Sequence, residues 1–98
     1  MRVISIRLLK TFWERHADAE GPLKAWYKTT RKADWKNLKE VRETYSKADG
    51  VSSLRGEILT VFNIGGHKYR LITRIRYDWG LINIRYVLTH REYDREKW

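Results

Sequence analysis

The sequence predicts an α+β domain in which helices cover one face of an antiparallel sheet. The first observation is the stretch 61–94, VFNIGGHKYRLITRIRYDWGLINIRYVLTHREYD, where two turn signals separate runs rich in Val, Ile, Thr and aromatic residues. The second is the segment 8–45, where apolar residues recur with the period of a helix. At 98 residues the chain has room for one core, so we expect residues 1–98 to form a single domain.

The N-terminal half is predicted to hold one strand and two or three helices. Met1–Ile6 alternates as a strand does, and could pair at the edge or in the centre of the sheet. Pro22 suits the first turn of a helix, and Asp34 suits the capping position before another. The predicted helices are Leu8–Ala17, Pro22–Ala33 and Trp35–Tyr45, and the serine- and glycine-containing segment Ser46–Glu57 is expected to be a loop.

The C-terminal half is predicted to be a three-stranded meander. Gly65-Gly66 is typical of a two-residue hairpin loop, because both turn positions require a positive φ. Asp78-Trp79-Gly80 is a second tight turn. The strands are therefore expected at Ile58–Ile64, Lys68–Tyr77 and Leu81–Thr89, with a charged tail over Arg91–Trp98 that is either a short helix or frayed.

Alternation along these strands predicts one apolar and one basic face. On the middle strand it separates Tyr69, Leu71, Thr73, Ile75 and Tyr77 from Lys68, Arg70, Ile72, Arg74 and Arg76. On the last strand it assigns Ile82, Ile84, Tyr86 and Leu88 to the apolar face, and Asn83, Arg85, Val87 and Thr89 to the other. Like charges on neighbouring strands repel, so five cations on one face favour an anionic partner. The alternative is a solvated face whose long side chains spread into water.

The composition indicates the kind of partner. A net charge of +9 favours a polyanion, either nucleic acid or an acidic protein. The absence of cysteine excludes disulfides, and neither a membrane-spanning apolar run nor a signal peptide is visible, so we expect a soluble cytoplasmic protein.

The histidines and carboxylates limit the chemistry. His16, His67 and His90 show no metal-ligand spacing and no acidic residues group with them, so neither a metal site nor a cofactor is expected. Metal-free acid–base cleavage of RNA remains possible, since RNA supplies its own 2′-OH nucleophile. Arginine would stabilise the phosphorane, and His, Lys or Tyr would transfer protons. These features alone do not separate a ribonuclease from a plain RNA-binding module.

The residue pattern resembles the HigB-type toxins of the RelE/ParE superfamily. The matching segments are FNIGGHKYRLI, INIRYVLTHREYD, FWERHADAEGPLKAWYK, ADWKNLKEV and KADGV, and they cover nearly the whole chain. The pattern departs at His67, where the family has Asn. The resemblance implies a RelE-like fold and an mRNA interferase that cuts mRNA on the ribosome without metal. It also implies a cognate helix-turn-helix antitoxin as partner.

The positions that match the motif give a hypothesis for the site. Arg70 and Arg85 hold the scissile phosphate, and Lys68 assists electrostatically. His90 is the general acid or base, and Tyr93 stacks on a base or orients a proton donor. Phosphates or bases of the RNA are contacted by Arg74, Arg76, His67 and Asn63. The structural alternatives are a strand-end cap for His90 and simple packing for Tyr93. Alternatives for the whole protein are a toxin of the ParE type that acts on DNA gyrase and a non-catalytic RNA-binding module.

Overall fold

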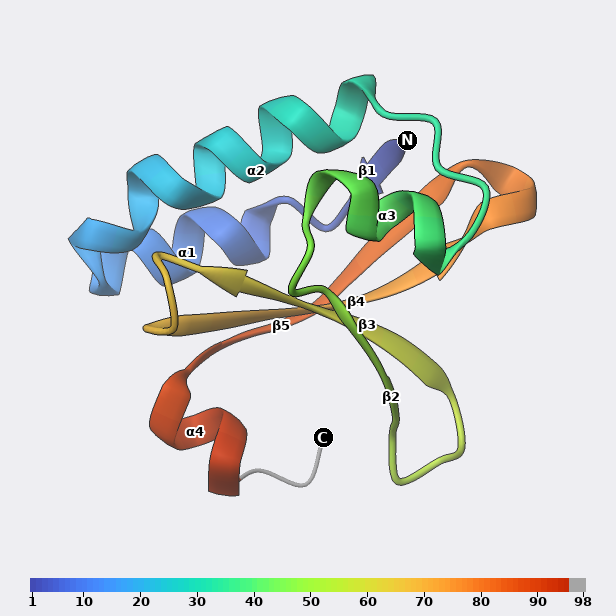
Figure 1. Ribbon diagram of the computed structural model, residues 1–98. Coiled ribbons are helices and arrows are strands. Elements are labelled where there is room, and N and C mark those ends of the chain that lie inside the picture. The colour runs from blue at the N-terminus through green and yellow to red at the C-terminus, as the bar shows by residue number, and fades with distance from the viewer. Residues whose placement is uncertain (96–98) are drawn as a thin grey trace.

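The computed structural model describes residues 1–95. A five-stranded sheet runs through the protein, and more of the chain lies on one side of it than on the other (Figure 1). The strand order is β1-β5-β4-β3-β2. All neighbours pair antiparallel except β1, which runs parallel to β5 at the edge, so the sheet is mixed. The strands are β1 (Arg2–Ile4), β2 (Asp49–Ser52), β3 (Ile58–Ile64), β4 (Tyr69–Arg76) and β5 (Leu81–Thr89).

Of the four α-helices within residues 1–95, three lie on one side of this sheet and the last lies on the other side (Figure 1). The covering helices are α1 (Arg7–Arg15), α2 (Glu20–Lys32) and α3 (Leu38–Thr44), with a 3-10 turn, Ala17–Ala19, between the first two. On the opposite side, α4 (His90–Arg95) follows β5 directly. The α+β prediction is confirmed. The predicted tail is helical as far as Arg95, and residues 96–98 lie outside the described part.

The main core lies between the helices and the sheet. Its centre is Phe62 of β3, whose ring contacts Trp26 of α2 edge-on at 5.4 Å between centroids, Tyr45 at 5.4 Å and Trp35 at 6.3 Å. Leu9 and Leu23 bring α1 and α2 onto the same cluster, and both are fully buried. The helical periodicity of the sequence therefore predicted these packed faces correctly.

The third helix begins later than predicted, and Asp34 is not its cap. Asn37 occupies the capping position, and its side-chain oxygen accepts a 3.0 Å hydrogen bond from the backbone N–H of Glu40. The Glu40 carboxylate accepts a bond of 2.9 Å from the backbone N–H of Lys36. This reciprocal arrangement satisfies N–H groups at the helix start.

Two predictions about loops were wrong. The segment predicted as a loop, 46–57, contains β2, which pairs Val51 with Leu59 of β3. The hairpin between β3 and β4 has a four-residue turn, in which Gly65 and Gly66 both have positive φ, 62° and 71°. Ile64 therefore pairs with Tyr69, and Lys68 belongs to the turn instead of the strand.

Candidate functional site

The sheet face opposite α1–α3, here called the open face, differs from the prediction because of a bulge in β5. Ile72 pairs with Tyr86 and Thr73 pairs with Ile84, so Arg85 has no register partner on β4. An extra residue reverses the alternation of the strand beyond it. The prediction that placed Tyr86 and Leu88 on the apolar face was wrong. The open face carries Leu59, Val61, Arg70, Ile72, Arg74, Arg76, Tyr86 and Leu88.

The open face is not uniformly basic, because an apolar patch occupies its middle. The patch consists of the buried residues Leu59, Val61 and Ile72, with the partly buried Val51, Leu88 and Tyr93 packed against them. Tyr93 of α4 is thus packed on the sheet. Its burial is the main cause that raises its pKa, and the nearby carboxylate of Asp49 is the second. Since Ile72 lies between Arg70 and Arg74 on the same strand face, the patch divides the cations into two groups.

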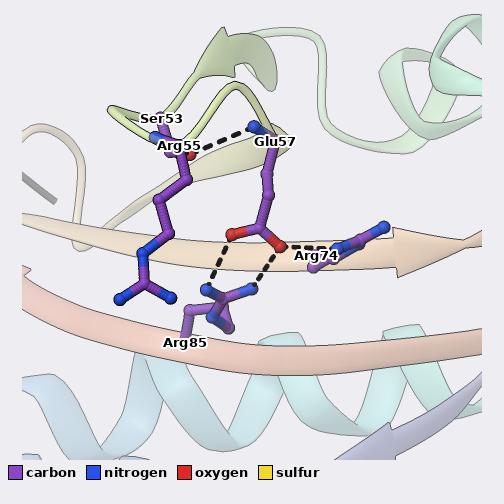
Figure 2. A network of polar contacts seen from close by, with 5 residues as sticks. All are labelled: Ser53, Arg55, Glu57, Arg74 and Arg85. Carbon is purple, nitrogen blue, oxygen red and sulfur yellow. Dashed lines mark hydrogen bonds and ion pairs between the residues drawn. The ribbon is translucent and has the colours of Figure 1, made fainter.

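The first group is the Glu57 cluster, consisting of Glu57, Arg74 and Arg85 (Figure 2). Arg85 donates two hydrogen bonds to the carboxylate of Glu57, of 2.9 Å to Oε1 and 3.1 Å to Oε2. Arg74 donates a third, of 2.5 Å, to Oε2. A planar guanidinium that engages both oxygens of a carboxylate is a strong and geometrically specific contact.

The charges of this cluster shift its proton affinities. The hydrogen bonds from Arg85 lower the pKa of Glu57 to about 2. Partial burial opposes this shift, and the hydrogen bond from Arg74 adds to it. The contact with Glu57 raises the pKa of Arg85. Although its side chain is only 21% exposed, Glu57 remains an anion at neutral pH because two cations bind it.

The turn that precedes β3 positions Glu57. The hydroxyl of Ser53 accepts hydrogen bonds of 3.2 Å from the backbone N–H groups of Arg55 and Glu57, and the carbonyl of Glu57 accepts one of 2.8 Å from the N–H of Ser53. Gly56 completes the turn with a φ of 81°. These bonds hold the start of β3 so that the carboxylate lies over the sheet, while Arg55 extends alongside it (Figure 2).

The second group is the His90 cluster, which consists of Arg70, His90 and Asp94. Arg70 donates hydrogen bonds of 3.0 Å to Nδ1 of His90 and 2.9 Å to the carbonyl of His67, and its guanidinium lies 5.5 Å from the ring centroid of Tyr93. Nε2 of His90 lies 3.2 Å from a carboxylate oxygen of Asp94. Arginine has no acceptor. Nδ1 must therefore be the unprotonated nitrogen, and a neutral ring carries its proton on Nε2, beside Asp94.

The remaining predicted site residues lie elsewhere. Lys68 forms an ion pair with Asp18, which also accepts a hydrogen bond from the hydroxyl of Tyr69. The hydrogen bond from Lys68 is the main cause that lowers the pKa of Asp18, and the one from Tyr69 is the second. Asp18 in turn raises the pKa of Lys68. His67 is exposed in the turn, and Asn63 pairs in register with Arg70. The structure therefore joins Arg70 to His90 and Tyr93, but it places Arg85 in the other cluster and Lys68 in neither.

The open face also carries two hollows that meet at Glu57. One, of about 340 Å³, has Leu54, Arg85 and Tyr86 on its walls. The other, of about 650 Å³, follows Arg74 and Arg76 toward the turn after β4. Arg55 and Glu57 border both. Sequence reasoning missed Glu57 and Tyr86, because the first was assigned to a loop and the second to the core face.

Two further features concern metals and membranes. Within residues 1–95, no three His, Asp or Glu side chains are grouped as a metal site would require. No helix in the described part of the chain is long and apolar enough to cross a bilayer.

A known protein family matches most of this chain. The family model of the HigB toxin, described as the RelE-like toxic component of a toxin–antitoxin system, matches residues 19–96. The chain belongs to the HigB toxin family. The match begins after α1 and includes both clusters of the open face, and a family of this kind has an antitoxin as its partner.

Named relatives of this HigB-family toxin cover almost its whole length. The "mRNA interferase toxin HigB" of Escherichia coli strain K12 is 28% identical over 94 residues, which is 96% of this chain and 88% of the relative. The proteins named "mRNA interferase HigB" from Escherichia coli O157:H7 and Shigella flexneri match with the same identity and coverage.

Proposed function

We propose that this HigB-family toxin is itself an mRNA interferase, a ribosome-dependent endoribonuclease that cleaves mRNA without a metal ion and stops translation. The names of its relatives support the class of activity. The observation that carries the proposal is the Glu57 cluster, where two arginines converge on one anion inside a hollow of the open face. A cognate helix-turn-helix antitoxin would neutralise the toxin in the cytoplasm.

The carboxylate of Glu57 occupies the position that a phosphate would take. Arg85 presents two donors and Arg74 a third, and such a fork matches phosphate oxygens as well as carboxylate oxygens. An entering phosphodiester would take these donors and leave the carboxylate without them. The hydrogen bonds that hold the pKa of Glu57 at about 2 would then be gone, and the group would become a better base.

These residues provide a complete route for RNA cleavage. The 2′-oxygen attacks phosphorus while Glu57 takes the 2′-OH proton, and the bond from phosphorus to the 5′-oxygen breaks. Arg74 and Arg85 stabilise the charge that develops on the phosphorane. Tyr86 borders the same hollow and donates a proton to the leaving 5′-oxygen. The products are a 2′,3′-cyclic phosphate and a 5′-hydroxyl end.

The His90 cluster serves the same substrate at a neighbouring position in this proposal. Arg70 would leave Nδ1 of His90 when it binds a phosphate, which would allow the ring to accept a proton beside the anion. This assignment keeps Arg70 and His90 as functional residues, but it moves the scissile phosphate to Arg74 and Arg85.

Cleavage of a labelled mRNA with and without translating ribosomes tests the proposal, in the presence of a chelator selective for transition metals that leaves the Mg²⁺ of the ribosomes in place. We expect cleavage only on ribosomes, cyclic phosphate ends, and a rate about 10²- to 10³-fold lower for Arg85→Ala. Arg31→Ala, on α2 across the sheet, is the matched arginine control and should cleave normally. If Arg70→Ala and His90→Ala abolish cleavage while Glu57→Gln and Arg85→Ala do not, the scissile phosphate lies at the His90 cluster. No cleavage in any condition would overturn the proposal, and inhibition of gyrase supercoiling would then be the next assay.

A further inference from the structure

An exposed tryptophan lies at the end of the open face. Trp79, in the turn between β4 and β5, is 67% exposed. The guanidinium of Arg76 lies 4.0 Å from the centroid of its ring, and the same arginine lies 3.8 Å from the Asp78 carboxylate. Arg76 thus covers one face of the indole and fixes its orientation, which leaves the opposite face available for a planar ligand.

A groove runs from the Glu57 cluster to Arg76, the arginine that lies over the indole of Trp79. The hollow of about 650 Å³ runs between the turn before β3 and the end of β4, and its walls include Arg55, Glu57, Arg74 and Arg76. Arg74 and Arg76 are alternate residues of one strand, so they share a face and lie about 6.6 Å apart along it. Successive cations along a groove suit the regularly spaced phosphates of a single nucleic-acid strand.

We propose that this groove, from Glu57 to Arg76, binds the single-stranded RNA that adjoins the scissile phosphate, and that Trp79, beside the end of the groove, stacks on one base. The inference rests on the proposed function, because that function places a phosphate at Arg74 and Arg85. Arg76 contacts the next phosphate. Its guanidinium lies on one face of the Trp79 indole, and an RNA base stacks on the other face. Aromatic stacking of this kind accepts any base, so it provides affinity and register without sequence preference.

Chemistry favours RNA over a protein segment as the occupant. The groove begins at the proposed phosphate position and presents three arginines in succession, Arg55, Arg74 and Arg76. An acidic protein segment could satisfy these cations, but it would offer the indole no planar base. The flat stacking surface therefore distinguishes the two occupants.

Binding of short 2′-O-methyl RNAs, which lack the nucleophile, tests the groove without cleavage. Fluorescence anisotropy would compare a core oligonucleotide with versions extended by a few nucleotides on either side. We expect extension on one side to tighten binding roughly tenfold. This gain should be lost in Trp79→Ala and largely kept in Trp79→Phe. Arg31→Ala is again the control, since Arg31 also lies over an aromatic ring, that of Tyr27, but on the helical side.

An abasic nucleotide placed along the extension would locate the stacked base. One position should weaken binding to the wild type and have no effect in Trp79→Ala. The inference is overturned if extension gives the wild type no gain, if Trp79→Ala keeps the gain, or if only an acidic peptide shows a Trp79-dependent affinity. If extended RNA binds more tightly only when Trp79 is present, but the protein never cleaves mRNA, the groove is an RNA-binding site and the proposed nuclease activity is wrong. Unchanged thermal unfolding of the variant would show that its fold is intact.

Discussion

Replacing Ile72 with alanine tests the apolar patch of the open face. Ile72 is fully buried against Leu59 and Val61, although its neighbours on the same strand face are arginines. The substitution removes three carbon atoms, which at about 0.8 kcal/mol per buried group is about 2.4 kcal/mol of transfer free energy. The cavity that remains adds to this loss, so we expect a destabilisation of about 3 kcal/mol.

Urea unfolding followed by tryptophan fluorescence would measure the change. For a domain of this size, about 3 kcal/mol corresponds to a decrease in Tm of roughly 12–24 °C, so thermal unfolding gives a second readout. Ile58→Ala is the matched control, because Ile58 lies on the neighbouring strand but is 67% exposed, and its cost should remain below about 1 kcal/mol.

A packed apolar patch and a solvated basic face predict different results in this experiment. If Ile72 lay on a solvated basic surface, as alternation alone suggested, its replacement would change stability by no more than about 0.5 kcal/mol. A value that small, equal to that of Ile58→Ala, would refute the packed patch and with it the separation of the two clusters.

Three other predictions concern the charged groups. Glu57→Gln should slow single-turnover cleavage about 10²- to 10⁴-fold. The same variant should bind RNA more tightly, because the arginines lose their internal anion. Cleavage by the variant at the wild-type rate would exclude Glu57 as the base. The pKa of Glu57 is lowered from 4.5 to about 2, so its stabilising contribution is complete above 4.5 and is lost as the pH falls toward 2. Urea midpoints measured from about pH 6 to about pH 3 should therefore fall less steeply in Glu57→Gln than in the wild type, and parallel curves would contradict the ion pair. Lys68→Ala should reduce the cleavage rate by less than about tenfold, since Asp18 holds this lysine away from both clusters, and a loss as large as that of Arg85→Ala would place Lys68 in the site.

Local patterns were sufficient for much of the fold. The apolar spacing of α1 and α2, the order of elements and the extents of β3 and β5 were predictable, because they depend on residues close in the chain. The edge strand β2 was not, since its sequence DGVS is rich in turn formers and becomes a strand only by pairing with β3. Propensity is a weak guide where tertiary pairing supplies the hydrogen bonds.

The candidate site was only partly predictable for a related reason. Alternation placed Arg70, Arg74 and Arg76 on one face correctly, but one unpaired residue in β5 moved Tyr86 to that face. No glycine or proline marks this bulge in the sequence. Glu57 was overlooked because its importance depends on Arg85, 28 positions along the chain, and such a contact leaves no local pattern.

The internal pairing of the arginines has a consequence for how the protein responds to salt. If the five cations that alternation predicted for the basic face each displaced an ion from a single strand, the logarithm of the binding constant would fall with the logarithm of salt concentration with a slope of about −3.5. Yet Arg74 and Arg85 share Glu57, Lys68 is paired with Asp18, and Arg76 lies beside Asp78. RNA would therefore exchange places with carboxylates of the protein as well as releasing ions. The affinity of this toxin should depend on ionic strength less steeply than its charge suggests.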